Sequence, residues 1–187
     1  LAGESVGSSA GGEQPKFCTI HREKGETRHL IVKFSPPRDS QAGVRWSELL
    51  ACEHIALETL ADAGMPASRA RWHESDARCY LEVTRFDRIG ARGRRGMVSL
   101  KHLDLAYYGL LDDWPSAADR LERDGWIVAR DADVLRILGW FGVFIGNTDM
   151  HFGNVSLFLD DALPLALAPA YDMLPMFWRP TSTGEVV

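Results

Sequence analysis

A dense polar cluster, Asn147-Thr-Asp-Met-His-Phe-Gly-Asn154, follows the most apolar stretch of the sequence. Asp149 and Asn154 have four residues between them, the spacing that catalytic loops for phosphoryl transfer use. In such a loop the aspartate accepts the proton of the attacking hydroxyl, and the asparagine holds a magnesium ion beside it. The spacing therefore indicates phosphoryl transfer. Taken alone, Asp149 and Asn154 are explained equally well by a polar loop that only caps helix ends.

Asp172 is a second carboxylate, in the apolar segment Pro169-Ala-Tyr-Asp-Met-Leu-Pro175. An unpaired carboxylate there is costly, and Mg²⁺ would relieve the cost because it prefers carboxylate and phosphate oxygens. Protein kinases place a metal-binding aspartate after their catalytic loop in the same order, with Phe-Gly where this chain has Met173-Leu174. The two motifs together favour a metal site over the alternative, a turn aspartate before Pro175.

Lys33 lies inside the apolar run His-Leu-Ile-Val-Lys-Phe, and kinases place their phosphate-binding lysine on such a strand. Considered alone, a lysine that extends to solvent from the strand's polar face is the simpler explanation. Glu53 lies on the apolar stripe of the following helix, where a carboxylate needs a cationic partner. We therefore predict an ion pair between Lys33 and Glu53, and we expect Glu48 and Glu58 to be solvated.

The opening segment up to Lys16 is rich in small residues, which expose backbone N–H groups and suit phosphate binding. It contains neither a Walker A sequence nor GxGxxG, so the signal is weak. Lys16 would add a second cation near the phosphates. His151 has no second histidine at a zinc-ligand spacing, and we expect it to support the catalytic loop rather than bind a metal.

Periodicity and turn residues predict the elements that would position these side chains. They are a hairpin, a helix, a strand pair, a buried helix that starts at Asp133, and a second strand pair: 16–22 with 28–34, 46–63, 71–73 with 79–84, 133–146, and 155–159 with 163–167. We expect an α+β, two-lobed protein-kinase-like fold, truncated at both ends. A β-rich N-lobe would cover residues 1–88, and a mainly helical C-lobe would cover residues 89–187, with a ligand cleft between them.

Composition narrows the class of protein. The chain has 187 residues and a net charge of −5, so a strongly basic nucleic-acid binder is disfavoured. The segment 85–101 is locally basic, which a solvated hairpin tip explains better than a docking site. Three scattered cysteines fit reduced thiols in a cytoplasmic protein. No apolar run approaches the ~20 residues needed to cross a bilayer.

These motifs together resemble the HipA family of bacterial Ser/Thr kinases, the toxins of HipA–HipB toxin–antitoxin modules. The resemblance covers most of the chain and depends most on Glu82–Arg88 and Asn147–Asn154. It implies ATP and Mg²⁺ as cofactors, Asp149 as the catalytic base, and Asn154 and Asp172 as metal ligands. Lys33 is similar to the family's ATP-phosphate lysine.

The resemblance also implies a set of nucleotide-binding residues: Ser9, Gly11, Gly12, Gln14, Lys16, Lys33, Glu53, Thr84, Phe86 and His151. Thr84 and Phe86 would offer backbone groups to adenine. In the family a serine of the Gly-rich loop is autophosphorylated, which places the modification at Ser9, with Ser8 as a rival. The chain departs from the family in Glu13, which adds a negative charge near the expected phosphates.

Partners follow from the same resemblance: a protein substrate, for which the family offers translation components, and a HipB-like DNA-binding antitoxin. By the same resemblance, we expect this sequence to be a fragment without the N-terminal subdomain and the C-terminal helical bundle of full HipA proteins. Two other functions fit the residues. One is a catalytically silent nucleotide-binding module in a DNA-binding regulatory complex, and the other is a small-molecule kinase with the same catalytic spacing.

Overall fold

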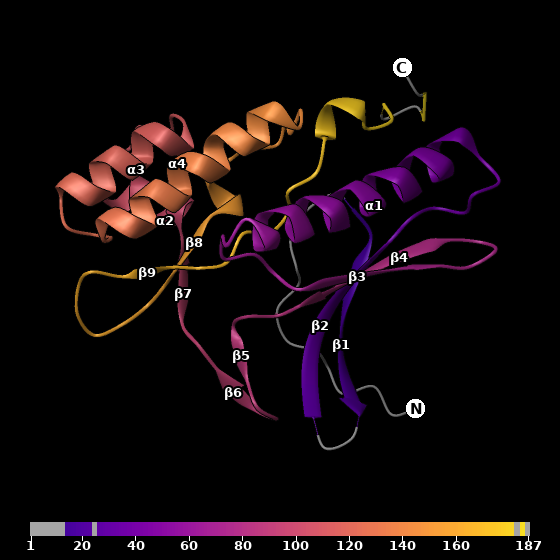
Figure 1. Ribbon diagram of the computed structural model, residues 1–187, viewed down its shortest axis with the longest axis horizontal. Helices are drawn as coiled ribbons and strands as arrows, with labels where there is room; N and C mark the ends of the chain where they lie inside the picture. Colours follow the sequence, from indigo (N-terminus) through magenta and orange to yellow (C-terminus); the bar gives the residue numbers. More distant parts are fainter. Residues whose placement is uncertain (1–13, 24–25, 182–183, 186–187) are drawn as a thin grey trace.

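Four antiparallel strands and one long helix come first in the chain (Figure 1). The computed structural model describes residues 14–23, 26–181 and 184–185. The sheet has the order β1-β2-β4-β3. Its elements are β1 (Lys16–Glu23), β2 (Glu26–Phe34), β3 (Ala70–Glu74), β4 (Cys79–Thr84) and the helix α1 (Gln41–Asp62). Both predicted strand pairs of this region are confirmed as antiparallel neighbours.

Helix α1 covers the sheet face on which Lys33 lies. Alternate residues of β4 are buried, and Leu81 packs in one cluster with Leu50 of α1. Lys33 stands directly opposite Leu81 in the β2–β4 register. Opposed residues of an antiparallel pair point to the same face, so Lys33 faces α1.

The helix α1 begins at Gln41, before the predicted start at Trp46. Ser40 is its N-cap, and the Ser40 hydroxyl accepts a hydrogen bond from the Gly43 N–H at 3.0 Å. A side chain at position 43 would meet the Pro37 carbonyl oxygen at 1.8 Å from its Cβ, so only glycine fits this first turn. The cap therefore sets the start, whereas the apolar stripe used for the prediction begins later.

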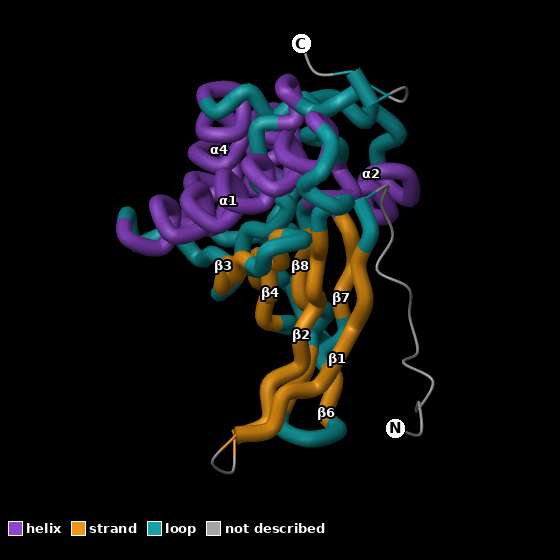
Figure 2. Tube along the Cα trace, turned by 90° about the vertical axis from the view of Figure 1, so that its right-hand side faces the viewer, coloured by secondary structure: helices purple, strands orange, loops and turns teal. Residues whose placement is uncertain are grey.

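A short hairpin, β5 (Arg88–Ile89) and β6 (Gly93–Arg94), leads from this sheet to the rest of the chain. A second sheet follows, with the order β7 (Met97–Ser99), β8 (Ser156–Phe158), β9 (Ala166–Leu167). The remaining helices are α2 (Leu100–Tyr107), α3 (Trp114–Arg123), α4 (Ala129–Phe144) and the 3₁₀ turns η1 (Phe152–Asn154) and η2 (Met176–Trp178). Viewed from the side, the helices gather above the strands (Figure 2). The predicted pair at 155–167 is confirmed but shorter.

Helix α4 is not the fully buried helix that the sequence suggested. It starts at Ala129 instead of Asp133, whose side chain is 69% exposed and bonds to Arg136. Only one face of α4 is buried, where residues such as Leu135 and Leu138 lie in the main core. Trp140 and Phe144 are 67% and 87% exposed. Apolar composition alone could not show which face of α4 has a partner.

The main core is shared between the two regions of the chain. Ala56, Leu57 and Leu60 from the second half of α1 lie in one cluster with residues of α2, α3, α4 and β8. Leu49 of α1 packs against Leu174 and Met176 near η2. Helix α1 therefore fixes the first sheet relative to the later helices. Among the described residues, no helix combines the length and apolarity needed to cross a membrane.

Candidate active site

Lys33 links the two regions of the molecule through two carboxylates. Its Nζ donates to Glu53 Oε1 and Oε2 at 2.6 and 2.7 Å and also contacts Asp172 Oδ1. Lys33 and Glu53 are 4% and 0% exposed. The predicted ion pair is thus confirmed, and the side chains of Glu48 and Glu58 are 59% and 62% exposed, as expected.

Burial and the opposite charges of Lys33, Glu53 and Asp172 shift the pKa values of all three groups. Burial opposes the charge of Lys33, but Asp172 and Glu53 raise the pKa of the ammonium well above its usual range. Burial raises the pKa of the Glu53 carboxyl even beside the lysine. Burial also opposes ionisation of Asp172, yet Lys33 holds the pKa of that carboxyl below its usual value. With two carboxylates to one lysine, the cluster favours a further cation.

Lys16 supplies part of that positive charge. It stands opposite Lys33 in the β1–β2 register, so its side chain is on the same face of the sheet. It lowers the pKa of both Glu53 and Asp172. The sequence placed Lys16 near the phosphates of a nucleotide, and in the structure its charge acts on the same two carboxyls as Lys33.

The predicted catalytic loop begins where α4 ends. The Asn147 N–H donates to the Gly142 carbonyl at 2.9 Å, and Gly146 has the positive φ of 73° that this turn requires. Asn147 Oδ1 then accepts from the Asp149 N–H at 3.0 Å, and Asn154 Nδ2 donates to the Asp149 carbonyl at 3.0 Å. The loop is thus closed on itself, while the Asp149 side chain stays 48% exposed.

Two hydrogen bonds hold the Asp172 segment against this loop. Asn147 Nδ2 donates to the Asp172 carbonyl at 3.4 Å, and the Tyr171 hydroxyl donates to the Gly153 carbonyl at 3.0 Å. The Tyr171 hydroxyl also bonds to Ser156 Oγ at 2.8 Å, and burial raises the pKa of Tyr171 to about 12. The structure therefore brings the loop of Asp149 next to Asp172 and, through Asp172, to Lys33.

The donors at this point suit Mg²⁺. Asn154 uses its amide nitrogen in the bond to Asp149, so its amide oxygen could serve as a metal ligand, and Asp172 could provide a carboxylate. In the part of the chain that the structure describes, no three His, Cys, Asp or Glu side chains gather as a metal site. Two oxygen ligands are what Mg²⁺ uses when waters and substrate phosphates complete its shell.

The other residues predicted to bind the nucleotide do not all lie in the described part of the chain, and those that do differ in burial. Ser9, Gly11 and Gly12 lie outside the described residues. Gln14 Nε2 is buried and has no hydrogen-bond partner among the described residues. His151 is exposed, with its Nε2 at 3.9 Å from Asp149 Oδ1.

At the end of β4, the Thr84 N–H already donates to the Arg69 carbonyl at 2.8 Å. This amide is therefore not available to adenine. The Phe86 ring packs against Phe158 and Tyr171, at centroid distances of 5.9 and 5.7 Å. Phe86 thus connects the end of the first sheet to the segment that carries Asp172.

A cavity of about 760 Å³ lies elsewhere. Its lining includes Arg69 and Arg71 of the outer strand region and Glu58 and Ala61 of α1, and Thr84 is its only member from the predicted site. Neither Lys33 nor Asp172 lines this cavity. Its strand residues Arg71 and Glu82 are paired with each other and lie on the opposite sheet face from Leu81, the partner of Lys33. The chemistry is therefore assigned from the charged cluster and not from this cavity.

Sequence reasoning did not assign roles to Asn147 and Tyr171. Asn147 had a local signal, since an asparagine two residues before Asp149 can accept the Asp149 N–H. Tyr171 had none, because its partners Gly153 and Ser156 are 18 and 15 residues away.

The sequence matches known proteins over nearly its whole length. The HipA-like C-terminal domain family matches residues 8–184. Toxin YjjJ of Escherichia coli K12 is 40% identical over 185 residues, which cover 98% of this chain and 42% of the relative. The chain therefore spans less than half the length of that curated relative.

Two solved structures share the fold. HipA of Shewanella oneidensis MR-1, in a complex with HipB and its operator DNA, gives a TM-score of 0.60 at 20% identity, over 96% of this chain and 46% of that one. The Helicobacter pylori proinflammatory kinase CtkA gives a TM-score of 0.58 at 15% identity, over 91% and 56%. The expected kinase-like, two-lobed α+β fold is confirmed by these likenesses.

Proposed function

The chain belongs to the HipA-like C-terminal domain family, and from that premise we propose that it is the catalytic core of an ATP- and Mg²⁺-dependent protein Ser/Thr kinase. One observation carries the proposal. The buried Lys33–Glu53 pair contacts Asp172, and Asp172 is hydrogen-bonded through its backbone to the loop of Asp149 and Asn154.

In the proposed reaction Asp149 accepts the proton of a protein Ser or Thr hydroxyl as the hydroxyl oxygen attacks the γ-phosphorus of ATP. The bond from that phosphorus to the β–γ bridging oxygen breaks, and ADP leaves. Lys33, held by Glu53, positions the phosphates. Asn154 and Asp172 would hold Mg²⁺, which neutralises the charge on the β- and γ-phosphates. These residues supply mainly orientation and electrostatic stabilisation.

The remaining nucleotide contacts are proposed from the family resemblance. Lys16 and Gln14 would complete the phosphate site with the backbone of Gly11 and Gly12, and Ser9 would be the autophosphorylated residue. Because the Thr84 N–H is already bonded, the Thr84 carbonyl and the backbone of Phe86 would bind adenine. A phosphate on Ser9 would add roughly two negative charges and compete with ATP for the same pocket.

The relatives' names support the proposal at a coarser level. The Escherichia coli relative is named a toxin, and the Helicobacter pylori structure is named a kinase. The Shewanella HipA is in a complex with HipB and operator DNA, so a DNA-binding antitoxin partner is proposed here as well. We also propose a cytoplasmic location, with a protein substrate, and a division into lobes near residue 88.

The test is phosphate transfer from ATP by the full-length protein, with mass spectrometry of the protein itself. Replacing the base in Asp149→Asn should lower transfer about 10²–10⁴-fold. Asp161→Asn, an exposed aspartate between β8 and β9, is the matched control and should keep full transfer. Phosphate on Ser9 in the wild type but not in Asp149→Asn would support autophosphorylation.

Other outcomes would contradict the proposal. Mg²⁺-dependent ATP binding without any transfer would overturn the enzyme and leave a nucleotide-binding module in a regulatory complex. Transfer to a metabolite but not to protein would instead identify a small-molecule kinase.

A further inference from the structure

We infer that Asn147 is a positioning residue that sets the spacing between the catalytic loop and Asp172, and thereby the affinity of the site for a divalent cation. This inference rests on the proposed function. It concerns a side chain that touches neither substrate nor metal in the proposed reaction.

Asn147 is fixed at three points. It is 6% exposed, and its N–H closes the end of α4 on the Gly142 carbonyl. Its Oδ1 accepts from the Asp149 N–H at 3.0 Å, and its Nδ2 donates to the Asp172 carbonyl at 3.4 Å, at the long end of the hydrogen-bond range. The amide thus bonds to the backbone of both Asp149 and Asp172 from the end of α4.

The chemistry of the amide explains why asparagine suits this position. An amide offers an acceptor and a donor at opposite sides of one plane. A carboxylate would present only acceptors to the Asp172 carbonyl, and an apolar side chain would leave the Asp149 N–H and that carbonyl without their partner.

The hydrogen bond from Asn147 reaches Asp172 at a residue with an unfavourable backbone conformation. Asp172 has a φ of 54°, in the left-handed region that residues with a Cβ seldom adopt. In this conformation the Asp172 carboxylate contacts Lys33, while the Asp172 carbonyl accepts a hydrogen bond from Asn147. Holding that carbonyl therefore restricts the orientation of the residue proposed to hold Mg²⁺.

A second bridge crosses between the same segments. The Tyr171 hydroxyl donates to the Gly153 carbonyl, next to the other proposed metal ligand, Asn154. One bridge runs from the loop to Asp172, and the other runs from the residue before Asp172 back to the loop. The two bridges together fix Asn154 and Asp172 relative to each other.

The test measures cation binding as well as activity. Mn²⁺ binding in the presence of ADP is followed by electron paramagnetic resonance in the full-length protein, beside transfer assays over a range of Mg²⁺ concentrations. Asn147→Ala should weaken Mn²⁺ binding about 10–100-fold and raise the half-saturating Mg²⁺ by a similar factor, as for residues that orient metal ligands. The KM for the protein acceptor should not change.

Two further variants keep the test decisive. In Asn147→Ser the hydroxyl can still accept from the Asp149 N–H but is too short for the Asp172 carbonyl, so Mn²⁺ binding should weaken while folding is retained. Val134→Ala removes a buried contact of α4 away from the site and should lower only the melting temperature. If both Asn147 variants bind Mn²⁺ within twofold of wild type, the inference is wrong. If the wild type neither binds Mn²⁺·ADP nor transfers phosphate, the proposed function itself fails.

Discussion

Asp172 and Asp104 are both aspartates that contact a basic side chain, yet their surroundings differ in kind. Asp104 is fully buried and accepts from the N–H groups of Leu110 and Leu111 at 2.9 Å each. Its other oxygen accepts from Arg120 Nη2 at 3.1 Å, and Arg120 is 16 residues away. Asp172 is 29% exposed at its side chain and contacts Lys33, which lies 139 residues away.

The difference separates a structural carboxylate from the one that we propose to bind a cation. Asp104 closes the turn after α2, where Leu111 has a φ of 46°, and local backbone donors use its oxygens. Asp172 has no such donors among the described residues, and only a lysine from another part of the fold pairs with it. A carboxylate that the protein leaves partly unbonded retains capacity for a ligand.

The largest effect should come from the functional aspartate. Asp172→Asn should lower phosphate transfer about a thousandfold, because Asn154 is neutral and Asp172 supplies the negative charge that the proposed Mg²⁺ site needs. The melting temperature of the nucleotide-free protein should stay near wild type, since Lys33 keeps Glu53. Transfer assays and thermal unfolding on one preparation check both parts. A large loss of stability with normal transfer per folded molecule would show that Asp172, like Asp104, has a structural role.

The structural aspartate should show the reverse pattern. Asp104→Ala leaves Arg120 and two backbone N–H groups without their acceptor and should cost about 3–5 kcal/mol, or roughly 10 °C in melting temperature. Transfer per folded molecule should remain at the wild-type value at low temperature. Selective loss of transfer without destabilisation would refute the distinction.

A smaller effect is expected at Glu53. Glu53→Gln removes the charge that orients Lys33 and should raise the KM for ATP about tenfold, the equivalent of one charge-assisted hydrogen bond. Burial raises the pKa of Glu53, so its contribution to stability is present at low pH and is lost as the pH rises through the folded-state pKa. The wild type should therefore lose stability between low pH and pH 8, and Glu53→Gln should lose less over the same range. Thermal unfolding between pH 4 and 8 tests this, and a variant that loses stability steeply toward pH 8 would contradict it.

The smallest effect concerns Tyr171. Its pKa is raised to about 12 by burial, against an unfolded value near 10. The resulting stabilisation is present below about pH 10 and is lost as the pH rises through 12. Tyr171→Phe should lose about 1 kcal/mol at neutral pH and should show a flatter decline above pH 10. Equal alkaline slopes for both proteins would show that the hydroxyl ionises as it does in water.

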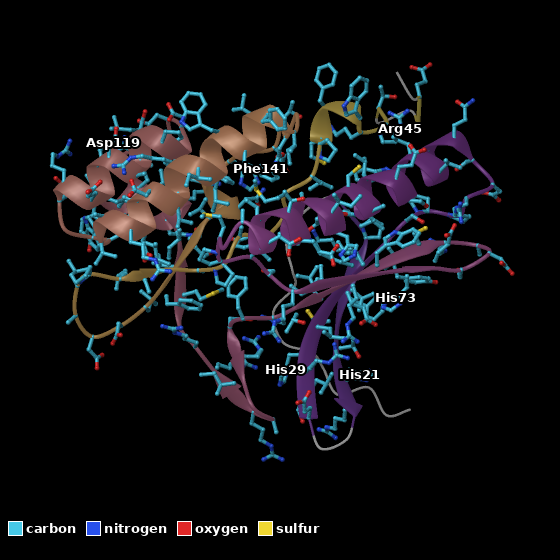
Figure 3. All side chains as sticks on the ribbon, in the orientation of Figure 1. His21, His29, Arg45, His73, Asp119 and Phe141 are labelled. Atoms are coloured by element: carbon cyan, nitrogen blue, oxygen red, sulfur yellow. The ribbon has the colours of Figure 1, made fainter. Side chains whose placement is uncertain are left out.

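Part of the fold and of the candidate site could be predicted from local sequence patterns. The strand pairs around Lys33 and Cys79 followed from short apolar runs between turn residues, and the Lys33–Glu53 pair followed from a carboxylate on an apolar stripe. The start of α1 depended on the Ser40 cap and on Gly43 beneath Pro37, which contribute nothing to apolar periodicity. The exposure of the outer face of α4 could not be predicted from the sequence either. His29 illustrates the same limit, since its ring reaches the Gly90 carbonyl of the β5–β6 hairpin at 3.0 Å, a contact between distant segments (Figure 3).

The sequence by itself determined the types and order of the groups in the proposed site, because Asp149, Asn154 and Asp172 lie in short motifs whose spacing is local. It also determined that Glu53, on the apolar stripe of its helix, needed a cationic partner. Only the tertiary structure decided that Lys33 has two carboxylate partners, that the Thr84 N–H is already bonded, and that Asn147 and Tyr171 connect the two segments. The physical reason is that these contacts join residues far apart in the chain, and their hydrogen-bond geometry exists only after the first sheet and the later helices have packed on α1.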